Sequence, residues 1–449
     1  LAAAQLWLLE RGTMGDFLDL FIECSCGARR NLGQATQPNL EEGPALGMCR
    51  GQRPWLGKAS NEKCGGENGK PRPNRLLVRS ASNAYFPQVV SAISIPERDI
   101  ELKKAVQRVW DDYLSTSESP EDVKRERKKV KVQAAIGPFK DEEVWAEIQR
   151  QKAPVQPAAK SIKQAEIETL LASQDEVGED APQSNYYARN SPLAPDRKGI
   201  MSLVERVVLV HRLREVVTQV GFTRFEPAEP DLESELNLGV RSGALARELS
   251  WLPAVENHGE GVFLALKSEA VQRWAARAEV KKRAKDLQLG FDEWQRRHQV
   301  VRRFPGLPYF LLHSLSHLLL TAVSLECGYS ASSISERIYS TDAGYGILLH
   351  TGTPDAEGTL GGLVQVGRRM EEMLHQALEM GRLCSNDPVC AQHQPPNAHE
   401  ERFLHGASCH GCLLISESSC EGSNEFLDRA LVIPTVEELG TEFFTEDLF

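Results

Sequence analysis

Two close pairs of cysteines near the C-terminal end constrain the fold of this sequence more than any other feature. The first pair is Cys384 and Cys390, in C-S-N-D-P-V-C, and the second is Cys409 and Cys412, in C-H-G-C. Each pair can present two thiolates from a tight turn, and the intervening loop lets the pairs converge on one ion. Four thiolates close a tetrahedral shell, whereas a catalytic zinc ion usually keeps one position for water. We therefore predict a structural four-cysteine zinc site.

The spacing of these cysteines leaves alternatives open. The first pair is wider than the roughly two to four intervening residues typical of zinc-binding pairs. The same cysteines could be unlinked buried thiols or could form disulfides. Cys420 is a fifth thiol nearby, which could replace one ligand or lie in the core.

A second and less regular set of cysteines lies near the start of the chain. Cys24 and Cys26 occur in C-S-C-G, where Gly27 would allow a tight backbone turn below a metal ion. Cys49 and Cys64 follow, although they are far apart for one zinc-binding pair. We predict a second zinc site on these four cysteines, with core or surface thiols as the alternative.

The composition is that of a folded, soluble protein with room for two to four domains. The chain has 449 residues, of which 41% are hydrophobic and 26% are charged. No apolar run approaches the about 20 residues that span a bilayer, so no membrane partner is expected. Ten cysteines, mostly clustered, fit a reducing cytosol, which predicts a cytoplasmic location. A net charge of −11 means that any contact with nucleic acid needs a local basic patch or a partner.

The patterns along the chain predict a mixed α/β, multidomain protein. Its N-terminal part is zinc-ribbon-like, its middle is helical, and an α/β zinc-binding domain ends the chain. The expected ranges are 1–98 for the zinc-ribbon-like and β region, 99–198 for a charged helical region and linker, 199–304 for a middle α/β region, and 305–449 for the zinc-binding domain.

Several segments carry more specific expectations. Residues 75–95 alternate and are rich in β-branched side chains, which predicts short strands. Residues 153–195 are rich in Ala, Gln, Pro and acidic residues and predict a linker or an exposed helix. Residues 201–220 show helical spacing of apolar side chains, whereas residues 251–256 and 259–266 predict two strands around a turn.

Two basic groups with nearby aromatic residues are candidates for nucleic-acid binding through phosphate contacts and base stacking. The first lies beside Tyr85 and Phe86, and the second lies near Trp274, Phe291 and Trp294. The alternative in both places is a solvated face of a sheet or helix. The candidate residues are Arg72, Arg75 and Arg79 in the first group, and Lys281, Lys282, Arg283, Arg296 and Arg297 in the second.

The apolar segment 311–320 predicts a helix that carries His313 and His317 one turn apart. Together with Asp355 and Glu357 they could build the metal or acid–base site of a nuclease or another hydrolase. The catalytic Glu of H-E-x-x-H is absent, however, which favours a hydrogen-bonded pair of buried histidines. The sequence also contains no G-x-x-x-x-G-K-[ST] phosphate loop, so we expect no NTPase motor in this chain.

A series of motifs over about residues 305–433 resembles, in sequence order, the DUF1998 domain. They include H-S-L-S-H-L-L-L, E-C-G-Y-S, D-A-E-G-T-L-G-G-L-V, C-S-N-D-P-V-C, G-A-S-C-H-G-C-L-L and E-F-L-D-R-A-L-V. DUF1998 is a zinc-binding module attached to, or accompanying, certain superfamily 2 DNA helicases. The resemblance implies that the metal ligands are Cys384, Cys390, Cys409 and Cys412.

Motifs in the front half, such as C-S-C-G-A-R-R, R-P-W-L-G and W-L-P-A-V-E-N-H-G-E-G-V-F-L, resemble the stand-alone branch of this family. That branch belongs to the bacterial antiphage system DISARM, where the helicase DrmA is its partner. The resemblance implies a non-catalytic zinc-binding subunit that helps a DrmA-like helicase to bind, load or sense DNA. A nuclease or hydrolase, and a purely structural zinc scaffold, are the alternatives.

Overall fold

The computed structural model divides the chain into two compact units, which are described separately. The smaller unit comprises residues 1–89, 218–229 and 240–253, and the larger comprises residues 90–217, 230–239 and 254–449. The structure describes residues 6–10, 20–31, 48–51, 56, 71, 74, 85–96, 98–137, 139–152, 161–172, 174–223, 232, 245–246, 248, 250–298, 302–351, 361–397 and 402–449.

A small antiparallel sheet begins the chain. It consists of β1 (Leu6–Glu10), β2 (Leu20–Cys24) and β3 (Arg29–Asn31), with β2 in the middle. A turn joins β2 to β3, and Gly27 adopts a φ of 84° within it. Because L side chains rarely adopt this conformation, glycine is the residue expected there. The tight turn predicted after C-S-C is therefore confirmed.

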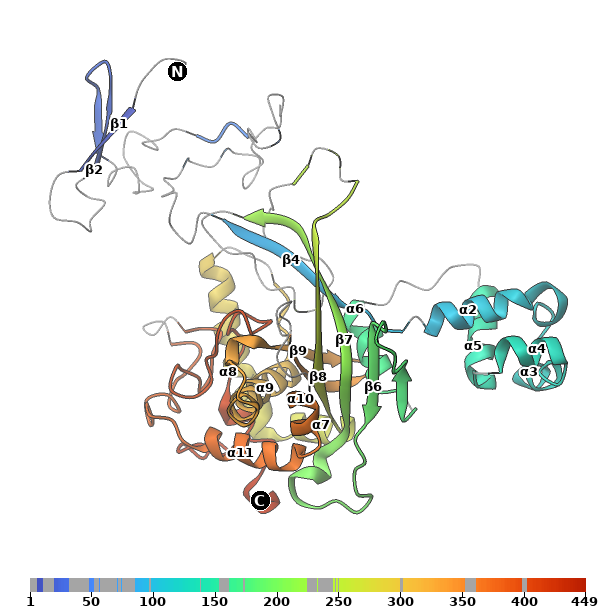
Figure 1. Ribbon diagram of the computed structural model, residues 1–449. Coiled ribbons are helices and arrows are strands. Elements are labelled where there is room, and N and C mark those ends of the chain that lie inside the picture. Colours follow the sequence, from blue (N-terminus) through green and yellow to red (C-terminus); the bar gives the residue numbers. More distant parts are fainter. Residues whose placement is uncertain are drawn as a thin grey trace. The chain divides into compact units, whose positions relative to one another are not determined.

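A seven-stranded sheet organises the larger part of the protein (Figure 1). Its strand order is β5-β6-β7-β8-β10-β9, and β4 also pairs with β7. Each of the four domain ranges expected from the sequence contributes at least one strand to this sheet. The boundaries between those ranges stay a prediction. The mixed α/β class is confirmed. The strands are β4 (Phe86–Ile93), β5 (Glu176–Gly178), β6 (Tyr186–Asn190), β7 (Val204–Thr223), β8 (Ala254–Leu266), β9 (Ile334–Thr341) and β10 (Gly344–Thr351).

The longest strand, β7, corrects the helix predicted at residues 201–220. Its valines contribute to both sides of the sheet, with Val204 and Val207 in one core cluster and Val208 and Val210 in the other. Two buried faces produce nearly continuous apolar runs, which imitate helical spacing. The expectation of two strands around a turn near residue 258 was also wrong, because β8 is a single strand.

Both faces of the sheet are buried, because successive side chains point to opposite sides. In β8, Val262 and Leu264 belong to one core cluster, whereas Phe263 and Ala265 belong to the other. In β10, Ile347 and Leu349 belong to the first of these clusters, whereas Leu348 between them belongs to the second.

Helix α6 (Ile162–Leu170) covers one face of the sheet and corrects the expectation that residues 153–195 form a linker or an exposed helix. The Glu166 carboxylate is buried and accepts hydrogen bonds from the Arg337 guanidinium (Nε–Oε2 2.5 Å), the Tyr339 hydroxyl (3.0 Å) and the Ile93 amide (2.9 Å). Buried polar groups with this many partners fix one packing arrangement of helix on sheet.

Helix α9 (Leu307–Cys327) covers the other face and packs on β9 and β10. It begins with a proline in its first turn and ends at Gly328, which has a φ of 71°. This helix corrects the expectation that no apolar run approaches the length of a membrane span, because it is long and apolar enough by length and composition; most of its side chains are nevertheless buried inside the protein. A helix that is apolar on all sides is typical of a protein core. The helices packed around it are α7 (Ser268–Ala275), α8 (Ala278–His298), α10 (Gly362–Gly367) and α11 (Met370–Arg382).

Residues 98–152 form a helical module with its own hydrophobic core, whereas the extent of the charged helical region expected at 99–198 stays a prediction. Val106, Leu114 and Ile148 are among its fully buried side chains. The module contains α2 (Arg98–Arg108), a π-helix (Trp110–Leu114), α3 (Pro120–Glu126), α4 (Val130–Ile136) and α5 (Asp141–Lys152).

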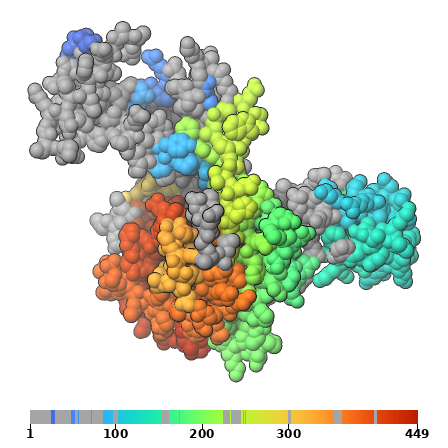
Figure 2. Space-filling view, viewed as in Figure 1, coloured from blue at the N-terminus to red at the C-terminus, as the bar shows by residue number. Residues whose placement is uncertain are grey.

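The segment after α11 contains little regular structure, apart from short 3-10 turns at Arg429–Leu431 and Glu446–Leu448. In the space-filling view, the orange and red residues that follow residue 361 gather on one continuous surface (Figure 2). Two buried charged residues anchor this segment. Asp428 pairs with Arg283 of α8, and Arg429 donates a hydrogen bond to the Gly381 carbonyl at the end of α11.

Candidate metal centre

The four predicted C-terminal zinc ligands converge in the structure. The Cys384 and Cys409 sulfurs lie 3.3 Å apart, and the Cys412 sulfur lies 3.8 Å from those of Cys390 and Cys409. All four sulfurs lie within 4.8 Å of one another. Zn–S bonds of about 2.3 Å place the sulfurs of a tetrahedral site about 3.8 Å apart. The arrangement therefore fits one zinc ion with four thiolate ligands.

Local backbone geometry turns these sulfurs toward one point. The amides of Asn386 and Gly411 donate hydrogen bonds to the sulfurs of Cys384 (3.4 Å) and Cys409 (3.3 Å). Such bonds stabilise the negative charge of a thiolate. A β-carbon at Gly411 would lie 2.5 Å from the Ser385 hydroxyl oxygen, so the two turns pack closely together at this glycine. The C-H-G-C sequence thus places the second pair against the first.

A buried arginine supports the cluster from behind. Arg429 donates a hydrogen bond to the Asp387 carboxylate (Nη2–Oδ2 2.6 Å), and the same carboxylate oxygen accepts one from the Cys384 amide (3.2 Å). Groups of this kind orient metal ligands without touching the metal. The D-R-A-L motif therefore belongs to the zinc-binding region, although no zinc-ligand pattern contains it.

The electrostatics of the four thiols favour a divalent cation. Burial raises the pKa of Cys384 to about 11, and the hydrogen bond with Cys412, followed by burial, raises the pKa of Cys390. The pKa of Cys412 falls to about 6, because Cys390, the Cys409 amide and the Arg429 charge stabilise its thiolate. A divalent cation removes the repulsion among thiolates, so that all four can ionise.

Two alternatives for the C-terminal cysteines are corrected. Sulfur–sulfur distances of 3.3 and 3.8 Å exceed the about 2.05 Å of a disulfide bond, and these cysteines are free. Cys420 does not replace one of the four ligands, because its sulfur lies beside the imidazole of His313 instead.

The N-terminal zinc site stays a prediction. Cys26 is exposed in the turn after β2, and the half-buried Cys49 accepts a hydrogen bond from the Gly51 amide (3.3 Å). Cys64 and the side chain of Cys24 lie outside the described residues.

Arg283 is corrected from a nucleic-acid candidate to a structural residue. Its side chain is 4% exposed, and its Nε lies 2.7 Å from the Oδ2 of Asp428, whose side chain is 0% exposed. It occupies the inward face of α8 together with Val280 and Leu287. It therefore cannot reach a phosphate.

The other basic candidates remain on the surface or fall outside the described residues. Lys281 and Lys282 are exposed on α8. Arg296 and Arg297 both pair with Glu293, at 2.6 and 2.8 Å, which offsets part of their charge. The members of the first group, Arg72, Arg75 and Arg79, lie outside the described residues.

His313 and His317 lie on buried turns of α9 and contact a carboxylate that was not among the predicted site residues. That carboxylate belongs to Glu336, and Cys420 completes the group. The sequence contained a signal for Glu336, because it lies midway between Ile334 and Ile338. Residues two apart in a strand share a face, and both isoleucines are buried. Asp355 and Glu357 lie outside the described residues, so the proposed hydrolase site with the two histidines stays a hypothesis.

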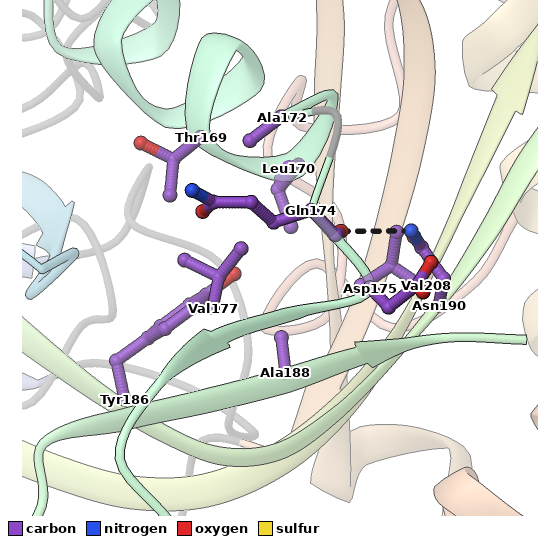
Figure 3. Close-up of a pocket in the computed structure, with 10 residues that line it drawn as sticks. All are labelled: Thr169, Leu170, Ala172, Gln174, Asp175, Val177, Tyr186, Ala188, Asn190 and Val208. Carbon is purple, nitrogen blue, oxygen red and sulfur yellow. Dashed lines mark hydrogen bonds between the residues drawn. The ribbon is translucent and has the colours of Figure 1, made fainter. Parts of the chain in front are cut away.

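A small pocket beside α6 offers no competing site (Figure 3). Half of its ten lining residues are aliphatic, and the Asn190 side chain donates a hydrogen bond to the Gln174 carbonyl (2.9 Å). Asp175 is the one acidic residue in that lining, which contains neither histidine nor cysteine. The pocket therefore lacks the groups for a metal or acid–base site.

Comparison with known protein families agrees with the cysteine geometry. The MrfA Zn-binding domain matches residues 315–413, a range that includes all four clustered cysteines. A domain of unknown function, DUF8724, matches residues 2–86. The chain thus contains a zinc-binding domain, and its four-cysteine cluster has the geometry to hold the zinc ion.

Individual proteins extend the comparison. The crystal structure of the DUF1998 helicase MrfA bound to DNA covers 50% of this chain and 23% of its own chain, at 15% identity and a TM-score of 0.23. That structural likeness is too limited to support an argument. The DISARM protein DrmB of Bacillus paralicheniformis is 30% identical over 457 aligned positions, which cover 98% of this chain and 77% of that protein. This chain belongs to the DrmB family of DUF1998-type zinc-binding proteins.

Proposed function

We propose that this chain is a non-catalytic zinc-binding subunit of a DISARM-type antiphage complex in the bacterial cytoplasm. Its partner is a superfamily 2 DNA helicase of the DrmA type, and it helps that motor to bind, load or sense DNA. The observation that carries the proposal is the 30% identity to a DISARM protein over 98% of the chain. This sequence contains no phosphate loop, and we place the motor in a partner polypeptide.

The zinc cluster has a structural role in this proposal. Four thiolates fill the coordination shell and leave no position for water or substrate. Zinc binding instead contributes folding free energy to a segment that has little regular structure. The cluster therefore holds the C-terminal surface in shape for a partner or for DNA.

Contact with DNA is proposed for the exposed basic residues of α8. Lys281 and Lys282 are neighbours on its surface, with Arg296 and Arg297 near its C-terminal end. Because the whole chain carries a net charge of −11, these residues would extend a groove of the helicase rather than bind DNA strongly alone.

A nuclease is the weaker candidate. His313 and His317 are 0% and 1% exposed, and both contact Glu336. A phosphodiester cannot approach side chains that are buried to this extent. A purely structural scaffold is the third candidate, and it differs from our proposal in requiring no DNA contact.

The test uses DNA binding and hydrolysis by the full chain. We expect weak binding that falls with salt, and no cleavage of DNA or ATP. The Lys281→Glu/Lys282→Glu variant should weaken binding and lower the salt dependence by nearly one unit for each phosphate that these lysines neutralise. Lys103→Glu/Lys104→Glu on the exposed surface of α2 is the matched control, because its charge change is identical. Equal effects of both variants would remove α8 from the DNA interface, and DNA cleavage abolished by His317→Ala would favour a nuclease.

A further inference from the structure

A second group of metal-binding side chains lies in the core, away from the four cysteines. His313 and His317 extend from α9, Glu336 from β9 and Cys420 from the C-terminal segment. Glu336 Oε1 lies 2.9 Å from His313 Nε2 and 3.2 Å from His317 Nε2, and His313 Nε2 lies 3.1 Å from the Cys420 sulfur. All four side chains are buried, and their ligand atoms lie within 4.8 Å of one another.

The orientation of His317 indicates that a cation belongs beside it. Its Nδ1 donates a hydrogen bond to the Leu413 carbonyl (2.8 Å), so in the neutral imidazole Nε2 carries a lone pair. That lone pair faces the Glu336 carboxylate oxygen. Two lone pairs at this distance repel one another unless a proton or a metal ion lies between them. A histidine that donates one nitrogen to a backbone carbonyl and turns the other toward a metal is a recurrent arrangement at metal sites.

The cluster contains a buried polar atom that lacks a partner and that a metal ion could bind. Glu336 Oε2 is buried and has no hydrogen-bond partner in the part of the chain that the structure describes. A buried carboxylate oxygen without a hydrogen-bond partner lowers the stability of the folded protein, because its lost hydration is not replaced. The Cys420 sulfur already accepts a hydrogen bond from the Asn424 amide (3.1 Å), as the zinc-binding sulfurs do from their own turn.

Charge balance gives the same answer. The Cys420 sulfur and the Glu336 carboxylate are both buried, and each carries one negative charge when it binds a metal ion. One divalent ion neutralises one carboxylate and one thiolate, which leaves a net charge of zero inside the core.

We propose that His313, His317, Glu336 and Cys420 form a second, structural zinc site. Two imidazoles, one carboxylate and one thiolate are ligands that zinc accepts, whereas Ca²⁺ and Mg²⁺ prefer oxygen ligands alone. Zn–N and Zn–O bonds of about 2.0–2.2 Å separate the ligand atoms of a tetrahedron by about 3.3–3.6 Å, so the separations of 2.9–3.2 Å found here need widen only slightly to admit the ion. Four protein ligands close the shell, so the site ties α9 and β9 to the C-terminal segment.

Two further features fit this role. A β-carbon at Gly422 would lie 2.8 Å from the His313 ring, so the loop that carries Cys420 packs directly on that ring. Leu413, whose carbonyl orients His317, follows Cys412 of the four-cysteine cluster. The two sites thus share one stretch of backbone.

The test is the zinc content of the full chain, purified without a polyhistidine tag and compared with two matched double variants. Glu336→Gln/Cys420→Ser removes both anionic ligands with little change of volume, and we expect one zinc ion fewer per chain. Glu326→Gln/Cys327→Ser makes the same chemical changes at the end of α9, outside the cluster, and should keep the wild-type content. Cys409→Ser should independently lose the other C-terminal ion.

Zinc X-ray absorption of the wild-type chain keeps the proposal testable if the first variant fails to fold. The C-terminal four-cysteine cluster and the predicted N-terminal one would each surround zinc with sulfur alone. Nitrogen and oxygen scatterers beside zinc would therefore come from the histidine site. Their presence in the first coordination shell is expected. An all-sulfur shell, or a folded Glu336→Gln/Cys420→Ser variant with unchanged zinc content, would overturn the proposal and leave a hydrogen-bonded network.

Discussion

Replacement of Arg283 by Met tests whether this residue supports the core or binds DNA. Its guanidinium contacts Asp428 at 2.7 Å, and the two side chains are 4% and 0% exposed. Asp428 also accepts hydrogen bonds from the amides of Ala407 (2.9 Å) and Ala430 (3.1 Å), so it cannot move to solvent without breaking the C-terminal segment. Removing one partner of a buried ion pair typically costs about 3–5 kcal/mol. We expect Arg283→Met to lose about this much free energy of unfolding, because methionine keeps much of the volume but not the charge.

Denaturant unfolding in zinc-containing buffer, followed by tryptophan fluorescence, measures this loss. Lys282→Met, the exposed neighbour on α8, is the matched control and should change stability by less than about 0.5 kcal/mol. The double variant Arg283→Met/Asp428→Asn should be less destabilised than the sum of its single variants, because neither charge then stays unpaired. A loss below about 1 kcal/mol in Arg283→Met, together with weaker DNA binding, would refute the structural role and restore this residue to the nucleic-acid interface.

Two other predictions concern zinc and pH. Cys409→Ser should lose one zinc ion and lower the stability or solubility of the C-terminal region before any specific activity changes, because zinc binding and folding are coupled. Thermal unfolding and elemental analysis measure these two effects. Full stability together with lost metal would contradict the prediction. Burial lowers the pKa of His405 to about 4, so the folded protein binds this proton less readily than the unfolded chain. Stability from this group is complete above pH 6.5 and falls toward pH 4, by roughly 2–3 kcal/mol after allowance for partial exposure. His405→Gln, compared with wild type across this range by denaturant unfolding, should show a smaller decrease, and equal pH profiles would exclude this origin.

Elements with one dominant pattern were predictable from the sequence. The helix at the apolar run of α9 was identified because every local preference there agrees with the fold. The four-cysteine site was predictable because its ligands lie in two short motifs, each of which forms one turn.

Features that depend on packing between distant segments were missed. The strand β7 was taken for a helix because burial on two faces hides its alternation. Arg283 was taken for a surface residue, although its spacing from Val280 and Leu287 places it on the inward face of α8. The partners of His313 and His317 come from β9 and the C-terminal segment, and only the packing of α9 brings them together.

DNA binding by the chain together with its helicase is the most direct measurement of the proposed function. Fluorescence anisotropy over a range of salt concentrations should compare the isolated chain, the DrmA-type helicase and the reconstituted complex. We expect weak, salt-sensitive binding by the chain, tighter binding by the complex than by either component, and ATP hydrolysis only when the helicase is present. Failure of the two proteins to associate, or an affinity of the complex equal to that of the helicase alone, would contradict a role in binding or loading DNA.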